Sequence, residues 1–134
     1  MWWLFVSLAL GGELQVQVDS PERRLGSIGC RLFDLDSSEV FPGGDTGQQT
    51  RAHVDQNGRK VCTFTKLRPG RYAVAALLDQ NQNNTLDTSR IGLPIEPWGV
   101  TNNVRPSFRA PSFDEAAIVV PSEGLVQTTV VLKL

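Results

Sequence analysis

The stretch "LRPGRYAVAALLD", residues 67–79, decides the fold of this chain. Its Pro69-Gly70 pair is a strong turn signal, because proline presets one backbone dihedral and glycine adopts conformations that other residues avoid. The residues that follow, 73–78, are all apolar. A short strand without polar positions is buried on both of its faces, as in the middle of a sheet. We therefore expect a central strand over residues 72–78.

Six further segments with strand-like patterns lie before and after this central strand. Several of them alternate polar and apolar residues, as "ELQVQV" does, which is typical of a half-buried strand. An Asn-Gly pair between the third and the fourth segment is a hairpin signal. The six segments are 13–18, 27–35, 49–55, 59–67, 116–120 and 125–134. Seven strands without a long helix predict an all-β fold, a seven-stranded antiparallel sandwich of two sheets.

The segment from Asp79 to about residue 115 is predicted to be one long irregular loop. Four of the chain's eight prolines lie in it, and proline interrupts strand pairing. A long segment without regular structure inside a compact domain is usually functional. We therefore expect any binding site of this domain to lie in the loop 79–115.

The loop begins with "DQNQNNTLD", residues 79–87, which has the spacing of a calcium-binding loop. Calcium takes oxygen ligands from alternate positions of such loops. Here the expected ligands are Asp79, Asn81, Asn83, the backbone carbonyl of Thr85, and Asp87. Arg90 stands where a bidentate glutamate is usual, so we expect weak binding, roughly 10⁻⁴ to 10⁻³ M.

An alternative needs no ion, because Asn and Asp side chains also bond to their own backbone in turns. The sequence does not decide between a calcium loop and such a polar loop. Further carboxylates that could complete a calcium site are those of Glu96, Asp114, Asp34 and Asp36.

A second candidate surface lies in "EPWGVTNN", residues 96–103. Trp98, Asn102 and Asn103 together offer a stacking platform and amide groups, which suit a carbohydrate or a protein ligand. The alternative is that Trp98 folds back and caps the open end of the sandwich, because a long loop needs a small core of its own.

The first residues, "MWWLFVSLALGG", predict an export signal or its remnant over 1–11, followed by one β-sandwich domain over 12–134. The apolar run is nine residues long, too short for the roughly 20 that span a bilayer. The alternative is a first, buried strand. We expect a periplasmic, cell-surface or secreted protein without a stable membrane span in the mature chain. The formal net charge of −1 argues against a nucleic-acid partner.

The chemistry-bearing residues do not form a recognisable catalytic set. The chain has two cysteines, Cys30 and Cys62, and one histidine, His53. An even pair of cysteines in an exported chain suggests a disulfide, and the alternative is two separate buried thiols. A lone histidine supports neither a zinc site nor a nucleophile with its base. We therefore expect a protein that is not an enzyme.

Several segments together resemble a bacterial family catalogued as domain of unknown function 2141. The matching pieces are "LFD" at 32–34, "SSEVFP" at 37–42, "LRPGRYAVAALLDQNQNNTLD" at 67–87, "IGLPIEPWGVTNN" at 91–103 and "PSFDEAAIVV" at 111–120. The resemblance implies a small exported domain with an immunoglobulin-like sandwich, similar to transthyretin-like modules. It implies no activity. Asn84 stands where the family usually has Gly, and Thr101 where it has Ser.

Three hypotheses for function follow. The first is an exported, non-enzymatic domain that binds a ligand or a protein through loop 79–115, with calcium ordering that loop. The second is a structural module that assembles by edge-strand pairing, for which the terminal "TTVVLKL" at 128–134 is long and apolar enough. The third, an enzyme of unknown activity, has the least support.

Overall fold

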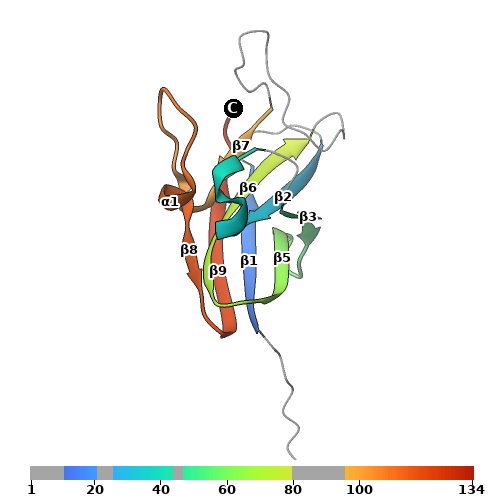
Figure 1. Cartoon of the computed structure of the whole chain (residues 1–134). Coiled ribbons are helices and arrows are strands. Elements are labelled where there is room, and N and C mark those ends of the chain that lie inside the picture. Colours follow the sequence, from blue (N-terminus) through green and yellow to red (C-terminus); the bar gives the residue numbers. More distant parts are fainter. Residues whose placement is uncertain (1–10, 21–25, 44–46, 80–95) are drawn as a thin grey trace, which may run out of the picture.

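Two β-sheets packed against each other make up most of the computed structural model, which describes residues 11–20, 26–43, 47–79 and 96–134 (Figure 1). The first sheet has the order β4-β5-β1-β9, with strands His53–Val54, Lys60–Leu67, Gly11–Asp19 and Glu123–Val131. The second has the order β3-β2-β6-β7, with strands Gln48–Arg51, Ser27–Phe33, Gly70–Asp79 and Trp98–Val100. The remaining elements are β8 (Ile118–Val120), the 3₁₀-helices η1 (Leu35–Val40) and η2 (Thr101–Asn103), and α1 (Phe113–Ala116). The predicted all-β sandwich is confirmed.

Strand β6 is the central strand that the sequence predicts. It pairs with β2 from Phe33–Ala73 to Ser27–Asp79. On its other side it pairs first with β8 and then with β7, both antiparallel. With neighbours along both edges, β6 spans the second sheet from the turn at Gly70 to the acidic residue Asp79.

The described residues contain nine strands where the sequence predicted seven. The segment predicted as one strand over 49–55 is divided, because β3 joins the second sheet and β4 the first. Strand β7 lies inside the segment that was predicted to be irregular. It has three residues, too few to show an alternating pattern. The segment predicted as a strand over 116–120 begins as the end of α1.

The prediction of an entirely antiparallel sandwich is wrong for one pair of strands. Strands β1 and β9 pair in parallel, from Gly11–Glu123 to Asp19–Val131. Strand β8 runs antiparallel to β6 in the second sheet, and the chain then crosses to the first sheet, so that β9 returns in the direction of β1. Alternation of polar and apolar residues does not encode strand direction, and so the sequence pattern gave no sign of this pairing.

The core between the sheets is closed by a disulfide. Cys30 of β2 and Cys62 of β5 are both buried and bonded to each other, with their Cα atoms 6.4 Å apart. Of the two alternatives left open for these cysteines, the structure shows the bridged one. The bond joins the two sheets and contributes roughly 3–4 kcal/mol by restricting the unfolded chain.

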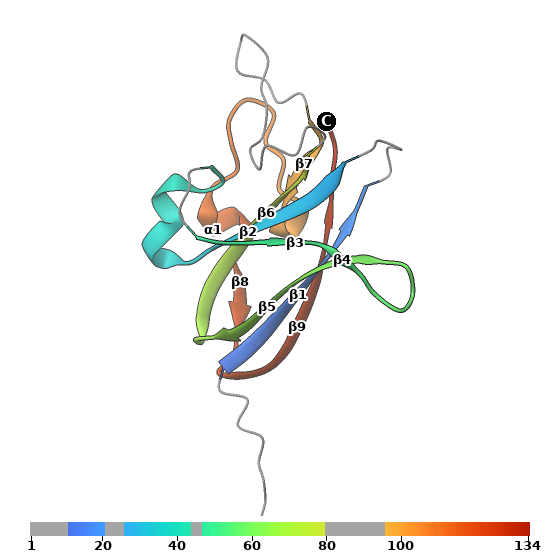
Figure 2. The same cartoon turned by 90° about the vertical axis from the view of Figure 1, so that its right-hand side faces the viewer.

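A second apolar cluster covers the outer face of β6. Phe41 packs edge-to-face on Phe33 and on Phe113, at ring distances of 5.1 and 6.2 Å. These rings lie over Ala73 of β6, together with Ala116 of α1 and others. Figure 2 shows η1 and α1 on the same side of the sandwich. The two short helices therefore explain why both faces of β6 are apolar.

The N-terminal prediction concerns residues that lie almost entirely outside the described part of the chain. Gly11, which the sequence assigned to the export segment, is the first residue of β1. Residues 1–10 lie outside the described part of the chain. No helix in the described part is long and apolar enough to cross a membrane.

Candidate functional site

Two carboxylates are buried at the borders of the segment 80–95, one where β6 ends and one just before β7 begins. Leu77 pairs with Trp98, and Leu78 N–H donates to the Pro97 carbonyl oxygen at 2.9 Å, so we infer that the same register, continued by one more residue, brings Asp79 opposite Glu96. Their exposed fractions are 2% and 3%. Carboxylates are almost never this deeply buried without a compensating partner. We call this pair the acid pair; it borders the segment 80–95 on both sides.

The acid pair contains the first of the predicted calcium ligands. Asp79 lies at the end of β6, as the loop prediction required. The other four predicted ligands lie outside the described residues: Asn81, Asn83, Thr85 and Asp87. Within the described ranges, no group of three or more His, Cys, Asp or Glu residues could hold a metal ion. The calcium hypothesis therefore remains a prediction; of the further carboxylates named from the sequence, Glu96 is the one that is buried at the other border of the segment 80–95.

The other acids considered for the calcium site lie elsewhere. Asp114 pairs with Arg71, near the start of β6, at 3.1 Å. Asp34 caps the first turn of η1, where its Oδ1 accepts from the backbone N–H of Ser37 at 3.0 Å. Since Ala73, near the start of β6, pairs with the residue before Asp34, this acid lies at the opposite end of the strand from the acid pair.

Trp98 is held from both sides, although it was predicted as a ligand platform. Its indole is half-buried and packs against the cluster on the outer face of β6. The guanidinium of Arg105 stacks on it at 4.2 Å. The same guanidinium donates to the carbonyl oxygens of Trp98 and Lys133, at 2.8 and 2.6 Å. Burial lowers the pKa of Arg105. Trp98 and Arg105 thus tie β7 to the C-terminal end of the chain, and the role of Trp98 as a ligand platform remains a prediction.

Thr101 and Asn102 of η2 connect β6 with α1 through side-chain hydrogen bonds. The buried Thr101 hydroxyl accepts from Val74 N–H at 3.1 Å and donates to the Ala116 carbonyl oxygen at 2.5 Å. Asn102 adopts a left-handed conformation, which Asn tolerates better than most residues. Its amide donates to the carbonyl oxygens on either side of Ala116, at 3.1 Å each. Both hydrogen bonds of Thr101 use its hydroxyl, which the Ser usual at this position in the family that the sequence resembles would also provide.

Asn103 satisfies the free edge of β9. Its Nδ2 donates to the Thr129 carbonyl oxygen at 3.2 Å, and its Oδ1 accepts from Val131 N–H at 2.9 Å. The side-chain amide thereby replaces a neighbouring strand at the end of an edge strand. Asn102 and Asn103 are both exposed, but their amide groups are engaged with the backbone. Their role as ligand contacts remains untested.

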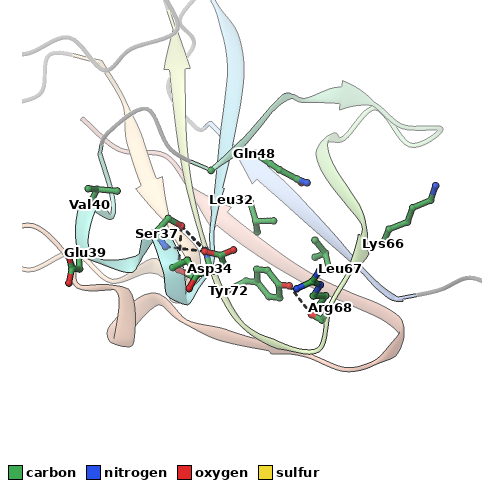
Figure 3. Close-up of a pocket in the computed structure, with 12 residues that line it drawn as sticks. Leu32, Asp34, Ser37, Glu39, Val40, Gln48, Lys66, Leu67, Arg68 and Tyr72 are labelled. Atoms are coloured by element: carbon green, nitrogen blue, oxygen red, sulfur yellow. Dashed lines mark hydrogen bonds between the residues drawn. The ribbon is translucent and has the colours of Figure 1, made fainter.

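A cleft lies at the other end of β6, where the sequence predicted no site (Figure 3). Its volume is about 550 Å³. Residues from the end of β2, from η1, from the start of β3 and from the β5–β6 turn line it: Leu32, Asp34, Asp36, Ser37, Glu39, Val40, Gly47, Gln48, Lys66, Leu67, Arg68 and Tyr72. Leu32, Leu67 and Tyr72 are buried and form its apolar floor. We call this feature the η1 cleft.

Tyr72 occupies the centre of the η1 cleft. In Figure 3 its ring lies between Asp34 on one side and Arg68 on the other. Its hydroxyl donates to the backbone carbonyl oxygen of Arg68 at 2.8 Å. Burial, and then the nearby Asp34 carboxylate, raise the pKa of the phenol. Tyr72 therefore stays protonated and holds the β5–β6 turn in place.

Lys66 stands at the rim of the η1 cleft in a strained conformation. Its φ of 57° lies in the left-handed region, which costs roughly 1–2 kcal/mol for a residue other than Gly. The cause is a bulge: Gly12 pairs with Leu67 but Leu14 pairs with Phe64, so β5 contains one extra residue. The bulge keeps Leu67 in the core and turns Lys66 outward.

The sequence contained a signal for this bulge that the strand prediction did not use. In "CTFTKL", residues 62–67, Cys62 and Phe64 alternate inward, but the next apolar residue is Leu67 rather than residue 66. A break of one position in the alternation is what an inserted residue produces. No comparable signal connects η1 with the β5–β6 turn, because these two walls are about thirty residues apart in sequence.

Comparison with known proteins gives one match. Residues 16–128 match a protein family described as "Uncharacterized protein conserved in bacteria (DUF2141)". The matched range begins in β1 and ends in β9, and so it includes the acid pair, the η1 cleft and all of β6. No curated protein and no solved structure matches the chain.

Proposed function

Since the chain belongs to the DUF2141 family of uncharacterised proteins conserved in bacteria, we propose that it is an exported, non-enzymatic binding domain whose 79–115 region is ordered by calcium. The observation that supports this most is the acid pair. Continued beyond Leu77–Trp98, the register of β6 and β7 would bring Asp79 opposite Glu96, and both buried acids lie at the borders of the segment that holds the other predicted ligands. The partner bound through this region would be a protein or a carbohydrate.

The chemistry of the ligands favours calcium over other metals. Carboxylate, amide and backbone carbonyl oxygens are hard ligands, and calcium takes six to eight of them. Asp79, Asp87 and Glu96 would contribute three negative charges, more than the loop alone offers. The absence of a cysteine or histidine from this set disfavours zinc.

The disulfide supports export. Bonds between cysteines persist in oxidising compartments and are rare in the cytosol. Cys30 and Cys62 bridge the two sheets and are therefore part of the folded structure. The same bond supports a non-enzymatic role, because neither sulfur is available as a thiolate nucleophile. His53, the chain's single histidine, is exposed on β4.

The assembly alternative receives less support from the terminal strand than the sequence suggested. Strand β9 is paired with β1 over residues 123–131. Beyond it, Lys133 and Trp98 exchange backbone hydrogen bonds of 3.0 and 2.9 Å. A strand that is bonded in this way is not available for donation to another chain. Donation of the terminal strand would therefore first require β9 to leave its own sheet, whereas pairing along the outer edge of β9 would not.

Calcium titration of the purified domain tests the proposed function. At a calcium concentration ten times Kd, mass action stabilises the fold by about 1.4 kcal/mol, which raises Tm by about 5 °C. We expect this shift near 10 mM calcium in the wild type, and its loss in Asp79→Asn and in Glu96→Gln. Asp114→Asn is the matched control, because Asp114 pairs with Arg71 at the far end of β6 and should keep the full shift. An unchanged Tm of the wild type at 10 mM calcium would refute the proposal.

A further inference from the structure

We propose that the η1 cleft is a binding site for a short zwitterionic peptide, with its carboxylate at Lys66 and Arg68 and its ammonium at the acids of η1. The cleft is separate from the acid pair, because it lies at the start of β6 and the acid pair at its end. The inference therefore goes beyond the calcium-dependent function and does not rest on it.

The size and the floor of the η1 cleft suit a small ligand. A volume of about 550 Å³ lies within the range of ligand sites in proteins, about 300–1,000 Å³. The floor of Leu32, Leu67 and the Tyr72 ring is rigid, because all three side chains are buried in the main core. Such a floor can contact the aliphatic body of a peptide, while polar groups around it fix the orientation.

The two walls of the η1 cleft carry opposite charges. Asp34, Asp36 and Glu39 belong to the η1 wall, and Lys66 and Arg68 to the opposite wall. In the described part of the chain no ion pair joins the two walls. A field that changes sign across a cleft complements a ligand that carries both charges. A simple anion would leave the acidic wall unused, and a metal cation would be repelled by the basic wall.

The fixed groups at the centre provide direction as well as charge. Asp34 uses Oδ1 for its cap on η1. The Tyr72 hydroxyl donates a hydrogen bond to the Arg68 carbonyl oxygen. The lone pairs of the phenol oxygen can therefore still accept a hydrogen bond from an ammonium group. Both groups are thus held by the fold before any ligand binds, which reduces the ordering cost of binding.

Lys66 is the residue whose placement the fold alone does not explain. The bulge in β5 needs a residue with positive φ, and Gly adopts that conformation without strain. The chain has Lys there instead, at the edge of the η1 cleft, with its side chain extended away from Tyr72 (Figure 3). Strained non-Gly residues cluster at binding sites, where the side chain is needed at that position. In the proposed site, the Lys66 ammonium would bind the carboxylate of the peptide.

Titration with tri-alanine, followed by ¹⁵N-resolved NMR in the presence of EDTA, tests the proposal without calcium. Tri-alanine carries an ammonium and a carboxylate at its ends. We expect millimolar binding with shifts at the backbone of Ser37, Lys66 and Arg68, and at least tenfold weaker binding of N-acetyl tri-alanine amide, which lacks both charges. Equal binding of the two peptides, or no shift at 20 mM tri-alanine, would overturn the proposal.

The variant that isolates the role of Lys66 is Lys66→Gly, because it relieves backbone strain instead of adding any. We expect a three- to tenfold loss of tri-alanine affinity together with an unchanged or higher Tm. Arg68→Gln should lower the affinity by a similar factor. Lys60→Gln, an exposed lysine at the other end of β5, is the matched control and should leave the affinity unchanged. Undiminished binding by Lys66→Gly would remove this lysine from the site and contradict the assignment.

Discussion

The two ends of β6 present charge in opposite ways. At its start, the η1 cleft holds acids and bases on separate exposed walls around Tyr72. At its end, two acidic residues, Asp79 and Glu96, are buried at the borders of the segment 80–95. Separated opposite charges in water can bind a mobile ligand and release it. Buried carboxylates need compensating interactions, and both acids already have interaction partners; under the proposed function, calcium would join them.

The same strand supports both arrangements because its middle is apolar on both faces. Residues between the two ends pack into the main core on one side and under η1 and α1 on the other. A rigid element that carries sites at its ends keeps their geometry independent. The predictions below either disturb this shared frame or alter one end at a time.

The largest effect is expected from removing the bridge between the sheets. Cys30→Ala with Cys62→Ala should lower the free energy of unfolding by about 2–5 kcal/mol, because the unfolded chain regains freedom and two buried sulfurs are lost. Urea denaturation measures the change. Since Cys30 pairs with Ala76, in the middle of β6, both ends should lose stability together. Hydrogen exchange that rises at only one end would contradict the shared frame.

A smaller effect is expected from the hydroxyl that joins β6 to α1. Thr101→Val keeps the shape of the side chain but leaves the Val74 N–H and the Ala116 carbonyl without this partner in a buried site. The cost should be about 1–3 kcal/mol in urea denaturation. Thr101→Ser restores the hydroxyl and should lose less than half as much. An equal loss in both variants would show that packing of the methyl group dominates.

Lys66→Gly changes the start of β6 in the opposite direction. We expect the free energy of unfolding to rise by up to about 1 kcal/mol, because Gly removes the left-handed strain but also increases the freedom of the unfolded chain. Lys66→Ala, which removes the charge but keeps the strain, should not show this gain. Thermal melts of the three proteins test the difference. A loss of stability in Lys66→Gly would contradict the strain argument.

The smallest effect is expected for an exposed ion pair that lies at neither end of β6. The two terminal guanidinium nitrogens of Arg109 donate to the two carboxylate oxygens of Glu115, at 2.6 and 2.9 Å. This contact, with help from the backbone N–H of Ser112, lowers the pKa of Glu115 to about 2. Carboxyl chemical shifts in an NMR pH titration should show this value, and in Arg109→Ala a value closer to that of a free glutamate.

The sign of the pH dependence follows from that shift. Glu115 has a lower pKa in the folded chain than the ordinary value of 4.5, so the unfolded chain binds more protons. Its contribution to stability is therefore complete above that ordinary value and disappears as the pH falls toward 2. The contribution should be small, because the pair is exposed to solvent. A pKa unchanged by Arg109→Ala would exclude the arginine as the cause.

The sequence predicted the middle of β6 and its acidic end for physical reasons. An apolar run between a turn signal and a polar stretch predicts a central strand. Asp79 directly follows that run in the sequence, so its place at the end of the strand was predictable as well. Glu96 as the facing residue was not predictable, because β7 is three residues long and lies among prolines. Register between strands that are distant in sequence is set by packing, which local patterns do not contain.

The η1 cleft was missed for a related reason. Its walls come from η1 and from the β5–β6 turn, which only the pairing of β2 with β6 brings near each other. The parallel pairing of β9 with β1 was missed because the alternation of polar and apolar residues is the same in parallel and antiparallel strands. In contrast, the roles of Asn102 and Asn103 depend on left-handed backbone, which their residue type does suggest.

The most direct test of the account is a calcium titration of the ¹⁵N-labelled domain observed by NMR. The account predicts shifts that saturate at millimolar calcium and are confined to the end of β6, at the amides of Leu78, Asp79, Glu96 and their neighbours, while Lys66, Arg68 and Tyr72 remain unchanged. Absence of any shift at Asp79 and Glu96, or equal shifts at both ends of β6, would contradict it.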